Sequence, residues 1–252
     1  MIELKSITKS YGGHKVLHEL NLEVERGKIT SFIGANGAGK STLLSIMARL
    51  LRQNGGEVFL EGRNLSKIKD NEVAKKVAVL KQSNFLNIKL TIRELVAFGR
   101  FPYSKGRLNS EDNEVIDKAL AYLDLVDLQD RFIDEVSGGQ RQRAFIAMVV
   151  AQDTEYILLD EPLNNLDMKN SVAIMKVLRS LTDELGKTIV LVLHDINFAA
   201  SYSDNIVAMR DGRILRCGAM DDIIDSLCLR EVFDMDFNVC DINDCKVCVY
   251  FK

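Results

Sequence analysis

Apolar residues follow two different patterns along this chain. In residues 2–7 and 20–24, apolar and polar positions alternate, which is typical of strands with one buried face. Residues 29–33, 156–159 and 188–193 are instead almost continuously apolar, as strands of a covered, largely parallel sheet are. Each of these runs leads into a loop and then into a helical pattern. The chain therefore predicts an α/β fold of three layers with an antiparallel N-terminal sheet beside it.

Helical signals replace strand signals in the middle of the chain. Thr91 and Glu94 have the spacing of a capping box, and a second helical pattern follows Ser110. We therefore expect residues 83–152 to form a helical segment that is inserted into a single α/β domain covering residues 1–252.

Strands and helices alternate again after the helical segment. Asp211-Gly212 lies between two further apolar stretches, at residues 206–209 and 213–217. Asp-Gly between two apolar stretches is typical of a two-residue hairpin turn of type I′, in which both central residues have positive φ. This part of the chain therefore predicts a β-hairpin. No internal repeat or low-complexity tract accompanies it.

Composition narrows the class of protein. Of the 252 residues, 47% are hydrophobic, which is enough to bury the core of a large soluble globular domain. The formal net charge of −3 gives no overall excess of Lys and Arg that would attract nucleic acid, so we expect no nucleic-acid partner, with a local basic patch as the alternative. Residues 1–10 lack the apolar core of a secretion signal, and no apolar run is long enough to cross a bilayer. If the protein works at a membrane, a partner spans it.

The cysteines admit two interpretations. Their number, five, is odd and fits free thiols in a reducing compartment better than a disulfide framework. Cys240, Cys245 and Cys248 have the spacing C-x4-C-x2-C, which is similar to one type of iron–sulfur ligation, although a fourth ligand is missing nearby. The valines beside these cysteines favour the alternative, in which the stretch forms β-strands.

A glycine-rich loop follows the first buried run. Gly34, Gly39, Lys40 and Ser41 complete the pattern G-x-x-x-x-G-K-[ST], and a helix is expected over residues 41–51. In such a loop, glycines let backbone N–H groups face a polyphosphate, and the helix N-terminus adds the positive end of its dipole. Lys40 then bridges the terminal phosphates and Ser41 binds Mg²⁺. The alternative is a glycine-rich turn without a ligand, but the preceding strand and the following helix favour a phosphate loop.

Two carboxylates follow another buried run. Asp160 and Glu161 come directly after residues 156–159, and the carboxyl ends of strands are where α/β sheets bind ligands. We expect Asp160 to contribute to the Mg²⁺ shell and Glu161 to orient and activate the attacking water as a general base. An acidic pair at a strand end can also be a solvated loop or a helix cap. Downstream of a complete phosphate loop, the catalytic interpretation is favoured.

A second glycine-rich turn, Ser137-Gly138-Gly139-Gln140, precedes a helix that we expect to run through Met148. By itself this turn is a weak signal, because Ser137 can simply cap the helix. Together with the first loop, however, it gives one chain two loops that are suited to reading phosphate. Many phosphate-loop kinases, GTPases and motors share the first loop and the acidic strand end, so the second turn is the feature that discriminates among them.

With these features on one chain, the sequence resembles the ATP-binding cassette (ABC) family along nearly its whole length. In that family, the signature turn of one subunit closes over the γ-phosphate of ATP held by the other subunit. The resemblance implies a P-loop NTPase core with an antiparallel β subdomain and an inserted helical subdomain, and an ATPase that uses ATP and Mg²⁺. The matching positions, in order, are Tyr11, Gly34, Asn36, Gly37, Gly39, Lys40, Ser41, Thr42, Gln82, Ser137, Gly138, Gly139, Gln140, Asp160, Glu161, Asp167 and His194.

The resemblance also implies roles for single residues. Tyr11 stacks on adenine, Gln82 links the Mg²⁺ site to the membrane partner, Asp167 communicates across the dimer, and His194 contacts the γ-phosphate. Each of these residues also has a purely structural interpretation. Tyr11 can be a surface aromatic and Gln82 a polar loop residue. Asp167 can be a helix N-cap and His194 a structural histidine at a strand end. The implied catalytic residues are Lys40, Glu161 and His194, and the implied metal ligands are Ser41, Gln82 and Asp160.

Three stretches are similar to the iron-chelate importers of this family. They are LTIRELVAFGRFPYSKGRL at residues 90–108, LNNLDM at residues 163–168 and FDMDF at residues 233–237. They imply an ATPase subunit that powers ferric siderophore uptake, with haem or cobalamin import as alternatives. An exporter subunit shares the same chemistry, and a non-transport ABC protein is a more distant alternative. The cargo rests on the resemblance alone.

The resemblance implies partners as well. We expect a homodimer of ATPase subunits, bound to integral membrane permease subunits at the cytoplasmic face of the bacterial inner membrane. A periplasmic or surface substrate-binding protein is then an indirect partner.

Overall fold

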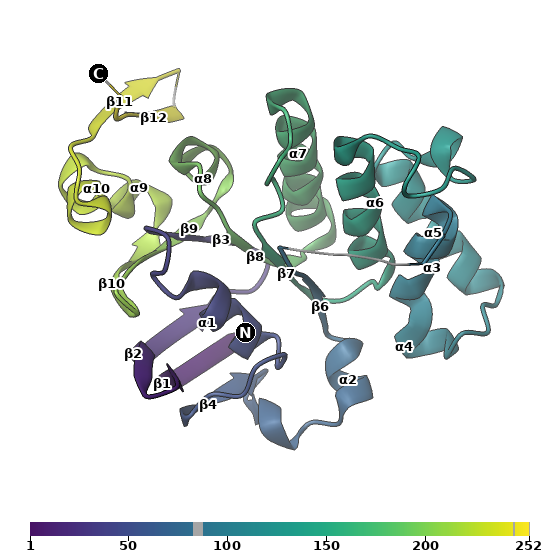
Figure 1. Cartoon of the computed structure of the whole chain (residues 1–252), viewed down its shortest axis with the longest axis horizontal. Coiled ribbons are helices and arrows are strands. Elements are labelled where there is room, and N and C mark those ends of the chain that lie inside the picture. The colour runs from purple at the N-terminus through teal and green to yellow at the C-terminus, as the bar shows by residue number, and fades with distance from the viewer. Residues whose placement is uncertain (83–87, 244, 252) are drawn as a thin grey trace. The chain divides into compact units, whose positions relative to one another are not determined.

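The computed structural model describes residues 1–82, 88–243 and 245–251. Residues 83–87, with which the predicted inserted segment begins, lie outside the described residues. The chain divides into two compact units, and Figure 1 labels most of their helices and strands. Unit 1 comprises residues 1–68 and the chain from Thr188 onward, and unit 2 is Lys69–Lys187. Both units combine strands with helices, so the expected α/β class is confirmed.

An antiparallel sheet forms the first part of unit 1, in the order β2-β1-β4-β5. The predicted N-terminal antiparallel sheet is confirmed, but β1 and β2 are longer than the alternation indicated. The register between them shifts three times between Leu4 and Ser10, and each shift interrupts the period of two that marks a strand in sequence. The strands are β1 (Ile2–Tyr11), β2 (His14–Val24), β4 (Gly55–Leu60) and β5 (Arg63–Asn64).

A second sheet of unit 1 has the order β10-β9-β3-β8. β3 runs parallel to β8 and β9, and all residues of β3 and β8 are buried, as their continuous apolar runs predicted. The predicted hairpin is also confirmed, since β9 and β10 are antiparallel and Asp211 and Gly212 have positive φ angles of 48° and 70°. The strands are β3 (Ile29–Ile33), β8 (Thr188–Val192), β9 (Asn205–Arg210) and β10 (Arg213–Ala219).

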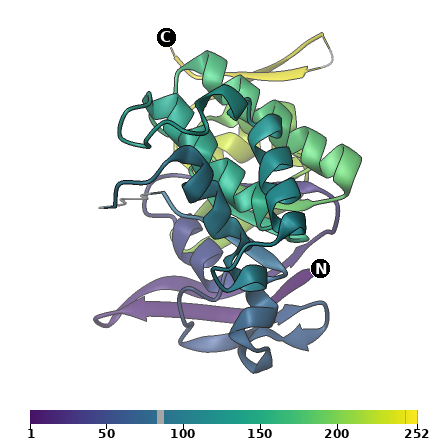
Figure 2. The ribbon, with the colours of Figure 1, turned by 90° about the vertical axis from the view of Figure 1, so that its right-hand side faces the viewer.

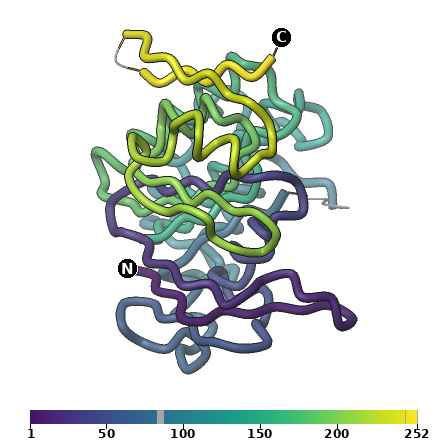
Figure 3. The backbone as a smooth tube through the Cα atoms, turned by 90° about the vertical axis from the view of Figure 1, so that its left-hand side faces the viewer, coloured from purple at the N-terminus to yellow at the C-terminus, as the bar shows by residue number. Residues whose placement is uncertain are grey.

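Short helices and a C-terminal hairpin complete unit 1. Helix α1 (Lys40–Met47) is shorter than the helix predicted over residues 41–51, because Arg49 adopts a positive φ of 57° and ends the helical path. Figures 1 and 3 show the C-terminal hairpin in yellow. The remaining elements are η1 (Leu65–Lys67), α8 (Ile196–Tyr202), α9 (Met220–Ile223), α10 (Ser226–Phe233), β11 (Asn238–Ile242) and β12 (Cys245–Val249).

The C-terminal hairpin contains three of the cysteines. β11 and β12 are antiparallel, with Cys240 opposite Val247 and Cys248 opposite Val239. The interpretation of this stretch as strands is thus confirmed. Within the part of the chain that the structure describes, no group of three His, Cys, Asp or Glu side chains is placed to hold a metal ion.

Unit 2 combines the parallel strands β6 (Val77–Leu80) and β7 (Tyr156–Asp160) with most of the helices. Helix α3 packs against α5 and α6, and Figure 2 shows this helical part from its own side. No helix among the described residues has both the length and the apolar character that a membrane span needs. The helices are α2 (Asp70–Ala74), α3 (Ile92–Ala97), η2 (Phe98–Arg100), α4 (Phe101–Ser104), α5 (Ser110–Tyr122), η3 (Val126–Leu128), α6 (Gly138–Ala151) and α7 (Met168–Leu185).

Side-chain caps fix where the helices of unit 2 begin. At α3 the predicted capping box is confirmed: the Glu94 N–H donates to Thr91 Oγ1 at 3.2 Å, and the Thr91 N–H donates to the Glu94 carboxylate at 2.8 Å. At α5 the sequence indicated a start after Ser110. The helix in fact begins at Ser110, because Asn109 and Asp112 form a second capping box.

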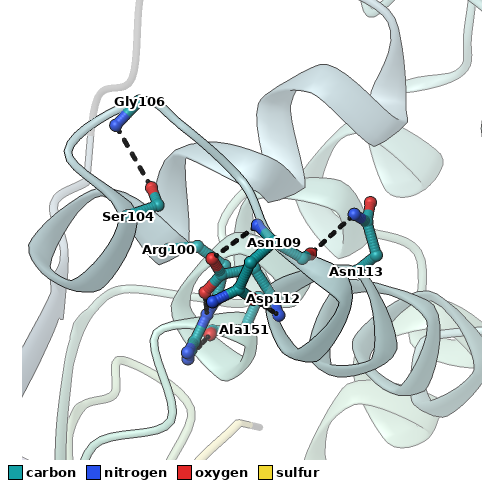
Figure 4. A network of polar contacts seen from close by, with 7 residues as sticks. All are labelled: Arg100, Ser104, Gly106, Asn109, Asp112, Asn113 and Ala151. Carbon is teal, nitrogen blue, oxygen red and sulfur yellow. Dashed lines mark hydrogen bonds and ion pairs between the residues drawn. The ribbon is translucent and has the colours of Figure 1, made fainter.

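A buried ion pair holds the helical part of unit 2 together. Arg100 and Asp112 are 5% and 3% exposed, and the Arg100 guanidinium donates to Asp112 at 2.9 Å and to the Ala151 carbonyl at 3.1 Å. Figure 4 shows how these contacts join the segment after α3 to the start of α5 and the end of α6. Burial raises the pKa of the Asp112 carboxyl, but hydrogen bonds from the Asn109 backbone and from Arg100 outweigh it and hold that pKa below its ordinary value.

We predict that Asp112→Ala lowers the free energy of unfolding by about 3 kcal/mol, because it leaves the Arg100 charge buried without its partner. Asp117→Ala is the matched control. Asp117 is exposed, and its partner Arg93 also donates to Gln129, so the loss is below about 1 kcal/mol. Urea denaturation followed by circular dichroism measures both values.

The contribution of Asp112 also depends on pH. Because its pKa is depressed in the folded protein, the stabilisation is present at neutral pH and is lost as the pH falls through the folded-state value. Equal, small losses in the two variants at pH 7 would contradict the structural role of the ion pair.

Candidate functional site

The phosphate loop leaves β3 through a glycine that has no room for a side chain. Gly34 has a φ of 143°, and a Cβ there would lie 2.1 Å from the carbonyl oxygen of Met209. At the other end of the loop, Gly39 has a φ of 96°, and its Cβ would lie 2.6 Å from Leu17 Cδ2. Both positions combine positive φ with close contacts, so only glycine fits them. The pattern read from the sequence is therefore required by the packing of the loop against β9 and β2.

The Lys40 ammonium lies inside this loop. Lys40 is 5% exposed, and Nζ donates to the carbonyl oxygens of Gly34 at 2.7 Å and Ala35 at 3.0 Å. Lys40 also begins α1, and the preceding residue, Gly39, has no side chain to cap the first turn. The first N–H groups of a helix have no partners within it, and the dipole makes this end positive. The loop therefore concentrates positive potential and N–H donors, which suits a polyphosphate.

The other predicted residues of the loop lie around this centre. Asn36 and Gly37 are exposed at its outer side, and Ser41 and Thr42 are half-buried in the first turn of α1. The predicted residues thus form one continuous path from the sheet into the helix.

His194 lies at the same edge of unit 1 as the phosphate loop. It follows β8, which is parallel to β3, so the two strands carry the loop and His194 at their carboxyl ends. The N–H of Leu193 donates to the Phe32 carbonyl at 3.2 Å and extends the pairing to the residue before His194. The side chain of His194 is exposed.

Tyr11 ends β1 and is 49% exposed. The ammonium of Lys9 lies 5.1 Å from the centre of its ring, so a cation–π contact orients the aromatic face. Tyr11 thus presents an exposed aromatic ring at the end of β1.

The acidic strand end of unit 2 is held by amide side chains. Asp160 is the last residue of β7 and is 7% exposed. Glu161 follows with a positive φ of 52°, and its Oε2 accepts hydrogen bonds from Gln82 Nε2 at 2.6 Å and Asn164 Nδ2 at 3.3 Å. The structure thus brings the predicted residues Gln82 and Glu161 together. A carboxylate fixed in this way has a defined orientation, which general-base catalysis needs.

Sequence reasoning missed Asn164 as part of this arrangement. Its backbone N–H also donates to the carbonyl of Glu161, at 3.2 Å, so the turn itself brings the side chain back to the carboxylate. An amide three residues after a strand-end glutamate is a signal that was available in the sequence.

Each of the predicted metal ligands carries an oxygen donor. Asp160 offers a buried carboxylate, and Gln82 uses its amide nitrogen for Glu161, so its oxygen is the atom suited to a metal. Within unit 1, Ser41 carries a hydroxyl oxygen. Such hard donors fit Mg²⁺, which prefers carboxylates, neutral oxygens and phosphate oxygens. When bound, Mg²⁺ would neutralise charge on the ATP phosphates.

The second glycine-rich turn caps α6. The Gln140 N–H donates to Ser137 Oγ at 3.3 Å, and the Ser137 N–H donates to Gln140 Oε1 at 3.0 Å. The N-cap interpretation of Ser137 is confirmed. Ser137 and Gly138 are exposed, and no described atom lies within 4 Å of a Cβ built on Gly138. The turn therefore presents an open surface.

Asp167 and the second turn are connected through one asparagine. Asp167 caps α7 by accepting from the Asn170 backbone at 2.8 Å, and Asn170 Nδ2 donates to its other carboxylate oxygen at 2.9 Å. The backbone N–H of Asn170 lowers the pKa of the Asp167 carboxyl. The same Asn170 side chain would lie 2.8 Å from a Cβ on Gly139. The helix-cap interpretation of Asp167 is thus confirmed, and its cap packs against the glycine-rich turn.

A further contact missed by sequence reasoning links α6 to the acidic strand end. Gln142 Nε2 donates to the carbonyl oxygen of Pro162, the residue after Glu161, at 2.9 Å. Within unit 2, the glycine-rich turn and the carboxylates therefore belong to one connected set of contacts.

Known proteins match this chain over most or all of its length. The family model described as ABC transporter matches residues 17–164. A petrobactin import ATP-binding protein of Bacillus subtilis (strain 168) is 55% identical over 252 residues, which is 100% of both chains. A petrobactin import ATP-binding protein of Bacillus anthracis is 48% identical over 93% of this chain and 94% of that protein. A solved dimeric ATP-binding cassette in a post-hydrolysis state, bound to ADP and Pi, is 32% identical with a TM-score of 0.78, over 87% of this chain and 99% of that one.

We predict that Lys40→Ala weakens ATP binding by about 10- to 100-fold, because a charge-assisted contact to phosphate is lost. Lys15→Ala, at an exposed position of β2, is the control and leaves the affinity unchanged. Isothermal titration with ATP measures both dissociation constants. Wild-type affinity in a folded Lys40→Ala variant would contradict the assignment of the loop.

Proposed function

This chain belongs to the ABC transporter family, and from that premise we propose that it is the ATPase subunit of an importer for ferric siderophores. The observation that carries the proposal is the 55% identity, over the full length of both chains, to a petrobactin import ATP-binding protein. Because the match spans the full length of both chains, the matched region contains the phosphate loop, the second glycine-rich turn and the acidic strand end. ATP binding and hydrolysis follow from the family, whereas the ferric siderophore as cargo is the proposed step.

In the proposed reaction, Lys40 and the first turn of α1 bind the ATP phosphates. Glu161 accepts a proton from the attacking water, and His194 contacts the γ-phosphate. The hydrogen bond from Gln82 to Glu161 supports this assignment, because it orients the carboxylate. The same contact supports a coupling role for Gln82, since a displacement of Gln82 would also displace the general base.

We propose that catalysis requires two copies of the chain, arranged head to tail. Each ATP is then held by the phosphate loop of one copy and the Ser137–Gln140 turn of the other. The open surface at Ser137 and Gly138 supports this arrangement, and the solved cassette bound to ADP and Pi is dimeric. Hydrolysis removes the γ-phosphate that both copies contact, which lowers the stability of the closed dimer and lets it reopen.

The remaining assignments concern partners and organisation. We propose that the dimer binds integral membrane permease subunits at the cytoplasmic face of the bacterial inner membrane, and that a substrate-binding protein delivers the ferric siderophore. We also propose that the whole chain acts as one ATPase domain in which residues 83–152 are the inserted helical subdomain. The permease pair then converts closure of the dimer into transport.

We predict that Gly138→Ala keeps the thermal stability and the ATP affinity of the single subunit but lowers turnover by at least about 100-fold. Within the subunit an added methyl group meets no described atom within 4 Å, so the loss must come from contact with the partner's nucleotide. Gly218→Ala, which also has room and lies on β10, is the control and retains turnover. A wild-type rate in Gly138→Ala would argue against a composite site.

The cargo is tested by reconstituting the chain with its cognate permease pair and binding protein in proteoliposomes. We expect ferric petrobactin to raise ATP turnover at least about fivefold, a size typical of coupling between sites. In the control Glu161→Gln, ATP still binds but no stimulated turnover occurs. Stimulation by haem or cobalamin, without a response to ferric chelates, would contradict the siderophore proposal and leave the ATPase assignment intact.

A further inference from the structure

The side chain of Asn197 connects α8 to the C-terminal hairpin. The backbone N–H of Cys248 donates to Asn197 Oδ1 at 2.7 Å, and Asn197 Nδ2 donates to the carbonyl oxygen of Cys248 at 3.3 Å. One amide therefore satisfies both backbone groups of a single residue in β12. Helix α8 and β12 are in contact. Both elements are labelled in Figure 1, and Figure 3 shows the C-terminal chain in yellow.

This pair of bonds takes the place of a third strand. In an antiparallel ladder, a residue that does not bond its opposite neighbour directs its N–H and C=O away from that strand. Cys248 lies opposite Val239, and its two groups point to Asn197 instead. Cys248 is 1% exposed, and burial raises the pKa of its thiol to about 11, so the junction is shielded from water. Without the amide, two shielded backbone groups would lack partners.

Asn197 also belongs to the helix turn that follows His194. Asp195 caps α8 by accepting from the N–H groups of Asn197 at 2.8 Å and Phe198 at 3.3 Å. On its other side, His194 follows Leu193, which is bonded to Phe32 of β3. His194 therefore lies between Leu193, which is bonded to β3, and Asp195, which caps α8.

A helix as short as α8 is not stable in isolation, so contacts outside the helix decide where its first turn lies. Ile196 provides one such contact, because it is buried. Burial of an aliphatic side chain is non-directional. The paired hydrogen bonds of Asn197 have a defined direction and fix the turn along the edge of β12.

We propose that Asn197 is a positioning residue for ATP hydrolysis: by tying the first turn of α8 to the C-terminal hairpin, it holds His194 where it contacts the γ-phosphate. The inference rests on the proposed role of His194. It assigns the C-terminal hairpin a part in catalysis, although none of the predicted site residues lies in the hairpin.

The test is a double-mutant cycle on ATP turnover by the purified full-length chain. Asn197→Ala lowers kcat about tenfold, since small misplacements of a reacting group are costly, and changes KM for ATP by less than about twofold. In the His194→Ala background, Asn197→Ala has no further effect, because the residue through which it acts is gone. Asn238→Ala, an exposed asparagine of β11, is the matched control and leaves kcat unchanged.

The ring signals of the histidines give a readout that does not depend on activity. The chain has three histidines, and His14 and His18 both lie on β2. In ¹H–¹³C spectra of Asn197→Ala, we expect the His194 signal to move while those of His14 and His18 keep their positions. If the alanine variant does not fold, Asn197→Asp serves in its place, because it keeps the acceptor for the Cys248 N–H but replaces the donor with a charged oxygen that repels the Cys248 carbonyl.

Each contrary outcome has a separate meaning. A wild-type kcat in Asn197→Ala, or an equal loss in both backgrounds, overturns the positioning role and leaves the proposed function unaffected. Wild-type turnover in His194→Ala overturns the assignment of His194, and the inference with it. A loss of thermal stability with an unchanged kcat and an unmoved His194 signal shows that the contact is structural only.

Discussion

The close approach of Gly34 to the Met209 carbonyl is the constraint on which the phosphate loop depends. A Cβ at this position would lie 2.1 Å from the oxygen, so the chain can leave β3 in this direction only with glycine. That exit brings the carbonyls of Gly34 and Ala35 to the Lys40 ammonium, which is buried between them. The two carbonyl contacts fix the position of the ammonium inside the loop, where an incoming phosphate would meet it. Packing of the sheet thus prepares the electrostatics of the loop.

Local signals account for what could be predicted from the sequence. The stretch at β3 is mostly apolar because the strand is buried on both faces, and Thr91 with Glu94 caps α3 through atoms three residues apart. Both signals, the apolar stretch and the capping box, depend on residues that are close together in the chain. The register shifts in β1 and β2 and the early end of α1 were not predictable in this way, since they depend on residues that adopt positive φ without being glycine, such as Arg49.

The contacts that organise the candidate site join residues that are far apart in the chain. Gln82 and Glu161 are 79 residues apart in the chain, and Asn197 and Cys248 are 51 apart. Glutamine and asparagine carry no periodic signal, and their partners are determined only when the strands have been ordered. The sequence identified Gln82 and Glu161 separately through the family pattern, but their hydrogen bond is a property of the fold. Asn197 had no such pattern to mark it.

A structural role and a functional role coincide at the two caps of unit 2. Ser137 and Asp167 each bind N–H groups of their own helix, so each would be retained for the stability of that helix alone. A cap, however, also places a polar side chain at the positive end of a helix, where an anion is favoured. Ser137 and Gly138 are exposed, so in the proposed dimer the turn would be accessible to a phosphate held by the second copy. The turn is therefore stable before the partner arrives, and closure of the dimer need not include the cost of ordering it.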